Sequence, residues 1–233
     1  MPHHASSPDG MDRRRFLRRS AAAAAGVVAA QTGISLAIRE LPAQTALPPN
    51  AALEELMAGN RRFVAGHLAS IERDLRMLKE QTAEKQEPFA AVLACADSRV
   101  PVELVFDQTI GQIFVTRLAG NIVTPEIIGS LEYGVAVLGV KAILVLGHSN
   151  CGAVKAAMKT EDVPGQISVL YSHIRPAVDQ SSGNVDKAIE INARIQSDLL
   201  RTSSTVVEKA TKAGTLKVAA GVYDLATGKV TLC

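Results

Sequence analysis

Two short clusters of chemically reactive residues stand out in the sequence. The first reads C-A-D-S-R at positions 95–99, and the second reads H-S-N-C-G at positions 148–152. Two thiols and an imidazole are a suitable ligand set for zinc, and a catalytic zinc site adds an open position to three protein ligands. The clusters therefore predict a catalytic zinc site formed by Cys95, His148 and Cys151.

The first cluster also carries a carboxylate and a guanidinium. Asp97 and a water molecule are the two candidates for the fourth position on the metal. Arg99 can hold the Asp97 carboxylate away from the metal through a bidentate salt bridge. Asp97 could then hydrogen-bond a metal-bound hydroxide and orient it, whereas Asp97 on the metal would define a closed state.

Each cluster follows a segment that we expect to form a buried strand. Residues 89–95 and 141–147 are short continuous apolar runs, and residues 112–117 are a further strand candidate. Apolar residues at helical spacing between positions 127 and 138 predict a right-handed strand–helix–strand crossover. Because sites form at the carboxyl ends of strands in open parallel sheets, the two clusters should meet there.

The rest of the chain completes one α/β domain over residues 47–233, with a central, mostly parallel β-sheet flanked by helices. One helix is expected to begin at Ala51 with Asn50 as its N-cap, and a charged helix to span residues 70–84. Strands are expected near the C-terminus at 216–223 and 229–232, joined by a turn at 226–228. The inward apolar stripes are expected at Leu53, Leu56, Met57 and Phe63 on the first helix and at Ala188, Ile191, Ile195 and Leu199 on a last helix.

The three cysteines are too few, and odd in number, for a disulfide framework. A Cys95–Cys151 disulfide is an alternative, but it would leave His148 and Asp97 without a purpose. A structural zinc site is a second alternative, although such sites usually place their ligands on short loops. Cys233 is expected to be an unengaged thiol.

The N-terminal region is basic and then weakly apolar. Residues 12–20 read DRRRFLRRS, and residues 21–38 are mostly small and apolar, which is the layout of an export signal. The consecutive arginines resemble the twin-arginine signal. We therefore assign residues 1–46 to a leader cleaved between positions 41 and 47, and expect a periplasmic or secreted protein with no stable membrane span after processing. The alternatives are a membrane anchor, for which the run is short and polar, or a basic disordered tail.

The formal net charge of +2 is concentrated in that basic segment. The remainder of the chain is slightly acidic, so a nucleic-acid partner is not expected.

The paired clusters resemble those of the β-class carbonic anhydrases, zinc enzymes that interconvert carbon dioxide and bicarbonate. The similarity extends from the helix at 53–63 to Gly152, and it includes F-V-T-R at 114–117 and A-G-N at 119–121. Carried over position by position, the resemblance implies zinc ligands at Cys95, His148 and Cys151 and a carboxylate–arginine dyad at Asp97 and Arg99. It implies that zinc-bound hydroxide attacks carbon dioxide, with activity that rises toward alkaline pH.

The resemblance also implies a substrate pocket. Gln86 falls where some members have a glutamine that hydrogen-bonds substrate, and Phe114 and Tyr133 fall at positions that line the apolar carbon dioxide pocket. The family further implies a homodimer or homotetramer with the pocket near the subunit interface. These three residues would then serve the zinc ion of a neighbouring subunit.

The sequence departs from the family at two informative positions. Leu118 follows Arg117 where members often have asparagine, so the loop near Asn121 is expected to differ in detail. A subtype that rests closed has tryptophan three residues before its first cysteine ligand, where this chain has Val92. Together with Gln86, this difference favours the open, constitutively active subtype.

Two other functions are compatible with these residues. One is hydrolysis of carbonyl sulfide or carbon disulfide by the same zinc ligands on the same scaffold. The other is non-catalytic zinc binding, against which the retention of both Asp97 and Arg99 argues.

Overall fold

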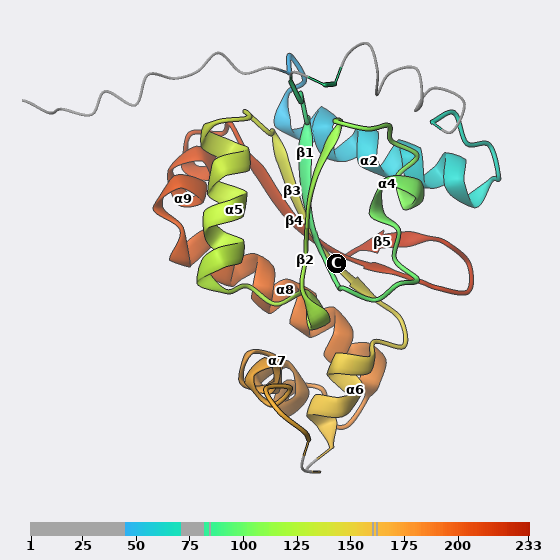
Figure 1. The fold of residues 1–233 in the computed structure, drawn as a ribbon, viewed down its shortest axis with the longest axis vertical. Helices are drawn as coiled ribbons and strands as arrows, with labels where there is room; N and C mark the ends of the chain where they lie inside the picture. The colour runs from blue at the N-terminus through green and yellow to red at the C-terminus, as the bar shows by residue number, and fades with distance from the viewer. Residues whose placement is uncertain (1–44, 71–81, 84, 160, 162) are drawn as a thin grey trace, which may run out of the picture. The chain divides into compact units, whose positions relative to one another are not determined.

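A computed structural model describes residues 45–70, 82–83, 85–159, 161 and 163–233. Its five strands form one sheet in the order β2-β1-β3-β4-β5 (Figure 1). The strands are β1 (Ala90–Ala94), β2 (Ile113–Arg117), β3 (Ala142–His148), β4 (Lys217–Tyr223) and β5 (Val230–Leu232). The first four strands pair in parallel, and β5 pairs antiparallel with β4. The predicted fold class, a mostly parallel sheet flanked by helices, is confirmed.

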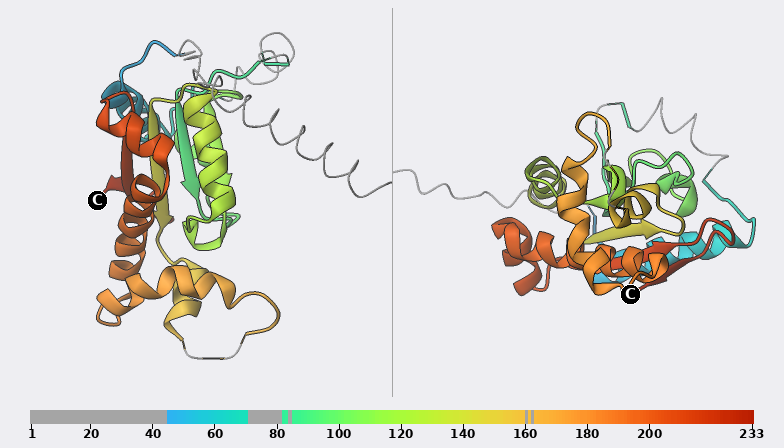
Figure 2. Two further views of the ribbon diagram at one scale, coloured as in Figure 1. Left: turned by 90° about the vertical axis from the view of Figure 1, so that its left-hand side faces the viewer. Right: turned by 90° about the horizontal axis from the view of Figure 1, so that it is seen from below.

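Helices cover both faces of this sheet and the region beyond the carboxyl ends of its strands (Figures 1 and 2). Helices α2 (Pro49–Val64) and α4 (Val102–Val105) pack on one face, and α5 (Pro125–Ala136), α8 (Val185–Ser203) and α9 (Thr205–Lys212) on the other. Helices α6 (Gly152–Met158) and α7 (Val169–Gln180) lie beyond the strand ends beside the short 3-10 helix η1 (Ala119–Asn121).

The alternating direction of the side chains along β1 explains why the sheet has a hydrophobic core on each of its two faces. Successive side chains of a strand point to opposite faces. Val92 therefore packs toward α2, and Leu93 packs toward α5 and α9. Every residue of β1 and β3 is buried, as the continuous apolar runs predict.

Helix α2 begins earlier than predicted. It starts at Pro49, with Pro48 at the N-cap and no side-chain cap, so the prediction of Asn50 as N-cap is wrong. The reason is that proline suits the first helical position, where its missing N–H has no intrahelical partner in any case. Leu53 and Leu56 are buried as predicted, and Met57 and Phe63 pack partly buried against the same core.

The inward face of α8 also differs from the prediction. The helix is present, but Ile191 and Ile195 are only half-buried and Leu199 is 37% exposed. The fully buried face instead includes Asn192 and Gln196. Both amides bond to backbone groups of the segment between β2 and α5, and Gln196 also donates to the His173 carbonyl of α7, which an apolar stripe could not do.

The β4–β5 hairpin is fixed to α2 by one buried side chain. Asn60 donates to the carbonyls of Val105 and Gly228 at 3.1 and 2.8 Å, and it accepts from the Val230 N–H at 2.8 Å. This contact joins segments more than 160 residues apart in the sequence, so Asn60 acts as a structural crosslink.

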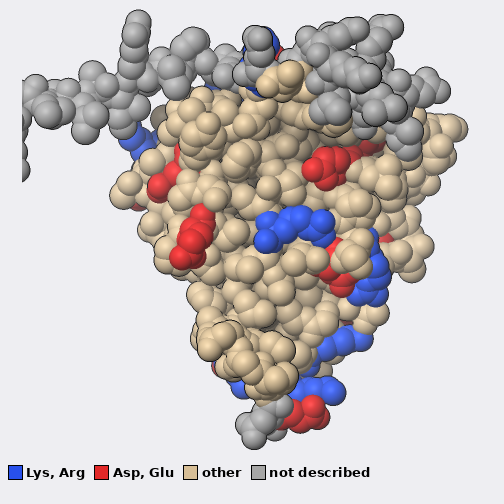
Figure 3. All heavy atoms as spheres, in the orientation of Figure 1, with Lys and Arg blue, Asp and Glu red and all other residues tan. Residues whose placement is uncertain are grey.

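Two predictions fall largely or wholly outside the described residues. These are the export leader and most of the charged helix at 70–84. Among the helices that the structure describes, none is long and apolar enough to cross a membrane. The face turned to the viewer in Figure 3 is mostly uncharged, with acidic and basic side chains interspersed.

Candidate metal centre

Cys95, His148 and Cys151 meet at the carboxyl ends of β1 and β3. One ligand atom from each lies within 4.8 Å of the other two. The exposed fractions of these residues are 4%, 0% and 1% respectively, and both cysteines are free thiols. The structure thus brings together the three side chains that the sequence predicts as zinc ligands.

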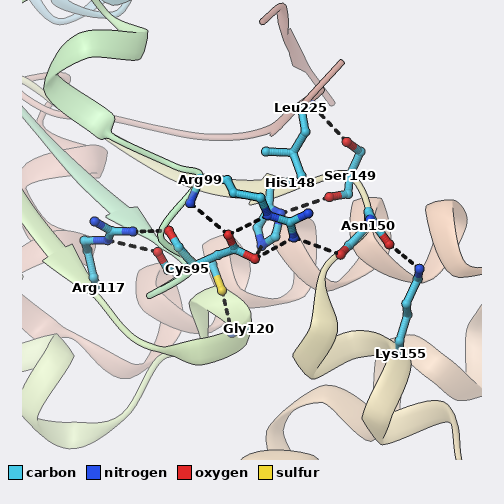
Figure 4. Close-up of polar contacts among 10 residues, drawn as sticks. Cys95, Arg99, Arg117, Gly120, His148, Ser149, Asn150, Lys155 and Leu225 are labelled. Carbon is cyan, nitrogen blue, oxygen red and sulfur yellow. Dashed lines mark hydrogen bonds and ion pairs between the residues drawn. The ribbon is translucent and has the colours of Figure 1, made fainter. Parts of the chain in front are cut away.

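The secondary structure explains this convergence. Cys95 directly follows β1, His148 is the last residue of β3, and Cys151 is the N-cap of α6. The intervening turn is tied to the β4–β5 region, because the Ser149 N–H donates to the Tyr223 carbonyl at 2.8 Å. The Ser149 hydroxyl also accepts from the Leu225 N–H at 2.9 Å (Figure 4).

His148 is oriented by its own turn. Its Nδ1 lies 2.9 Å from the carbonyl oxygen of Ser149, so this nitrogen carries the proton and donates it. The opposite nitrogen, Nε2, is buried and has no hydrogen-bond partner among the described residues. An imidazole whose Nδ1–H is bonded to a backbone carbonyl and whose Nε2 is free is arranged as a metal ligand.

The two thiols shift each other's pKa in opposite directions. The hydrogen bond from the Cys151 thiol lowers the pKa of Cys95 to about 4. The same hydrogen bond, together with burial, raises the pKa of Cys151. The Gly120 N–H adds a hydrogen bond to Cys95 Sγ at 3.3 Å, which favours the thiolate further.

Asp97 lies beside the cluster but is held by Arg99. The guanidinium bonds both carboxylate oxygens, at 2.9 Å from Nε and 2.7 Å from the terminal nitrogen, and the Arg99 N–H donates at 2.9 Å. These hydrogen bonds keep the pKa of Asp97 well below its usual range, so the carboxylate is ionised at neutral pH. Asp97 Oδ2 is 3.8 Å from His148 Nε2, close enough to reach a small ligand in the cluster.

Arg117 is a site residue to which the sequence reasoning gave no role. It lies at the end of β2 and donates to the carbonyl oxygens of Cys95 and Asp97, which fixes the segment between them (Figure 4). Its signal in the sequence is an arginine at the carboxyl end of a predicted strand. Asn192 and Gln196 were also missed, and their signal is a pair of amides four residues apart on one helix.

The three predicted pocket residues do not join the cluster within one chain. Gln86 is exposed and precedes the amino end of β1. Phe114 pairs in register with Ala91, three residues before the end of β1, so it lies roughly 10 Å along the strand from the cysteine end. Tyr133 is 47% exposed, and its ring centroid is 6.3 Å from that of Phe114.

The cluster fits a zinc ion. Two thiols and an unpartnered imidazole nitrogen converge in a buried place, and zinc prefers these donors. Asp97 is engaged by Arg99, so three protein ligands remain and a fourth position is free of protein donors among the described residues. Three protein ligands with one further position are the arrangement of a catalytic zinc site.

Comparisons with known proteins agree with this geometry. The family model described as "Carbonic anhydrase" matches residues 90–230. A carbonic anhydrase of Mycolicibacterium smegmatis is 37% identical over 194 residues, which cover 79% of this chain and 93% of the relative. Carbonic anhydrase 2 of Mycobacterium tuberculosis is 33% identical, with 79% and 92% covered.

Solved structures show the same fold. The β-carbonic anhydrase of Coccomyxa, in complex with acetazolamide, matches with a TM-score of 0.62 and 31% identity, covering 81% of this chain and 86% of that one. Two tetrameric β-carbonic anhydrases of Sordaria macrospora include a chain that matches with a TM-score of 0.62 at 20% identity, covering 78% and 96%. The chain belongs to the β-class carbonic anhydrase family. It is therefore an enzyme that catalyses the reversible hydration of carbon dioxide.

Proposed function

We propose that this chain hydrates carbon dioxide to bicarbonate and a proton at the cluster formed by Cys95, His148 and Cys151, with zinc as the metal. The observation that carries the proposal is the convergence of the two thiols on the unpartnered Nε2 of His148. Zinc held there would act as a Lewis acid that lowers the pKa of a water molecule and so supplies a nucleophile.

Asp97 is the residue that orients this nucleophile. Its carboxylate accepts hydrogen bonds and is 3.8 Å from His148 Nε2, so it lies beside the position where a water molecule would react. Arg99 keeps the carboxylate ionised and off the metal. This arrangement supports assignment to the open subtype, as does Val92 in the place of a tryptophan.

A second subunit would complete the substrate pocket. Phe114 and Tyr133 form an aromatic pair beside the free edge of β2, and the exposed apolar residue Val137 lies on the same helix as Tyr133. Val137 is the C-cap residue of that helix. An exposed strand edge next to apolar side chains is a common pairing surface. We therefore assign a homodimer as the minimal unit, with a homotetramer as the alternative, in which Gln86, Phe114 and Tyr133 face the metal of the neighbour. Light scattering on Tyr133→Lys tests this: a protein that stays dimeric would contradict it.

Export by the twin-arginine pathway is a further part of the proposal. It is supported by the run of arginines at positions 13–15 and the weakly apolar segment at 21–38. Fusing residues 1–46 to a reporter that is active only after folded export tests it. Signal that is lost when Arg13 and Arg14 are both changed to lysine would support this route, and unchanged signal would contradict it.

The catalytic proposal is tested by stopped-flow measurement of carbon dioxide hydration on the zinc-loaded protein. Fast turnover that requires the metal supports it. A zinc-loaded protein that leaves carbon dioxide unreacted but hydrolyses carbonyl sulfide or carbon disulfide would establish the sister hydrolase instead. A zinc-loaded protein inactive on all three substrates would be a non-catalytic zinc protein.

A further inference from the structure

The loop between β2 and α5 has an unusual backbone and touches a metal ligand. Gly120 and Asn121 adopt φ angles of 78° and 45°, and both residues are buried. The Gly120 N–H donates to Cys95 Sγ at 3.3 Å. Glycine accepts this conformation, but Asn121 is strained in it, and the buried backbone groups of both residues need partners, so something must hold the loop in place.

Helix α8 supplies those partners through two fully buried amides. Asn192 Nδ2 donates to the Gly120 carbonyl at 2.8 Å, and Gln196 Oε1 accepts from the Val123 N–H at 2.8 Å. The Gln196 amide nitrogen donates to Asn192 Oδ1 at 3.2 Å, which orients Asn192. The exposed fractions of the two residues are 0% and 1%.

Gly120 also packs closely against α7. A Cβ atom added at this glycine would lie 2.7 Å from Ile174 Cδ1 of α7. The backbone at position 120 is thus held by the amide of Asn192 and has Ile174 packed against it. This confinement fixes the direction of the N–H that points at Cys95 Sγ.

We propose that Asn192, oriented by Gln196, is a positioning residue for the metal ligand Cys95. By holding the Gly120 carbonyl it restricts rotation about the Gly120 Cα, and so helps keep the N–H of the preceding peptide unit directed at Cys95 Sγ, where its hydrogen bond draws charge from the thiolate. A thiolate that gives less charge to the metal leaves the metal a stronger Lewis acid. The hydrogen bonds of Asn192 go to Gly120 and Gln196 and not to the donor atoms of the metal ligands, so its effect is transmitted through the backbone of Gly120. This inference rests on the proposed metal site.

Asn60 provides a matched control. It is also a buried asparagine on a helix, it also donates to backbone carbonyls, and it is 2% exposed. Its partners are Val105, Gly228 and Val230, which lie in other segments than the loop of Gly120. Asn60→Leu therefore removes a comparable buried amide without removing a contact of Gly120 or Cys95.

The experiment loads the full-length protein and its Asn192→Leu, Gln196→Met and Asn60→Leu variants with cobalt(II) in place of zinc. Cobalt–thiolate charge-transfer absorption reports the electron density on sulfur. We expect a shift to longer wavelength in Asn192→Leu, with cobalt affinity weakened about 10- to 100-fold as is typical of residues that support metal ligands. Gln196→Met should shift the band the same way by less, and Asn60→Leu should leave it unchanged.

A folded Asn192→Leu variant with the wild-type band and affinity would overturn the inference, as would an equal shift in Asn60→Leu. If Asn192→Leu does not fold, Gln196→Met takes its place in the test. A wild-type band and affinity in Gln196→Met, or an equal shift in Asn60→Leu, would then overturn the inference. A wild-type protein that binds no cobalt would overturn the proposed metal site together with this inference, so the two failures can be told apart.

Discussion

Two aspartate–arginine ion pairs have the same composition but connect different parts of the chain. Asp107 binds Arg62 Nε at 2.6 Å through one oxygen, and its other oxygen accepts from the N–H groups of Ala69 and Ser70 at 2.9 Å. It thereby joins α2, the segment after α2 and the connection to β2. Asp97 makes three hydrogen bonds as well, but all of them come from Arg99, two residues away.

The difference indicates separate roles for the two pairs. A pair that joins distant segments opposes unfolding, because it exists only when those segments are assembled. A pair within one short turn contributes little to assembly, and its 49%-exposed arginine is screened by solvent. Asp97 instead lies 3.8 Å from His148 in the metal cluster. We infer that Asp107 stabilises the fold and that Asp97 serves the reaction.

The largest effect should come from the metal ligands beside Asp97. Cys151→Ser removes one of the two thiolates that hold the metal. Because residues that only support ligands cost about 10- to 100-fold, loss of a ligand should lower turnover by more than about 100-fold. Zinc content after dialysis and carbon dioxide hydration measure the effect. The matched control is Cys233→Ser, since that half-buried cysteine lies outside the cluster; a comparable loss there would contradict the assignment.

Asp97→Asn should separate activity from stability. The amide keeps the shape of the side chain but can no longer act as an anionic acceptor for the reacting water. Positioned groups of this kind typically contribute about 100- to 10,000-fold to rate, so turnover should fall within that range. Zinc content and the denaturant midpoint should stay near those of the wild type. Full activity in this variant would remove Asp97 from the mechanism.

Asp107→Asn should give the opposite result. It loses the charge that Arg62 needs while the carboxamide oxygen can still accept from the backbone, so unfolding should become easier by about 1–3 kcal/mol. Urea unfolding measures this change, and turnover per folded molecule should be unchanged. A variant as stable as the wild type but catalytically impaired would reverse the roles that we assign to the two pairs.

Acid should produce the smallest effect. Burial opposes ionisation of Asp107, but the hydrogen bonds from Arg62 and Ser70 outweigh it and lower its pKa in the folded state. A lowered folded pKa stabilises the protein above the unfolded value of about 3.9, and this contribution is lost as pH falls through the folded pKa. The stability gap between wild type and Asp107→Asn should therefore narrow below about pH 4 in urea titrations. A gap that widened there would contradict the pairing.

The sequence predicted the elements that regular periodicity defines. Buried strands appear as continuous apolar runs, and ligands directly after β1 and β3 meet because parallel strands end at one edge. The pair of amides Asn192 and Gln196 is visible in the sequence, but its partners are not, because the loop that folds against these residues comes from about 70 residues earlier. Periodicity therefore gave only part of the buried face of α8, since Ala188 is buried as predicted whereas Ile191 and Ile195 are half-buried and Leu199 is exposed. The positions of Gln86, Phe114 and Tyr133 relative to a metal depend on a second subunit and stay a prediction.

Stopped-flow hydration of carbon dioxide from pH 6.5 to 9, on zinc-loaded wild type, Asp97→Asn and Asp107→Asn, tests the central claim most directly. We expect fast, metal-dependent turnover that rises toward alkaline pH, collapses in Asp97→Asn and survives in Asp107→Asn. Turnover that is absent near neutral pH and appears only at alkaline pH would indicate the closed subtype instead of the open one. A zinc-loaded wild-type protein without hydration activity at any of these pH values would contradict the account.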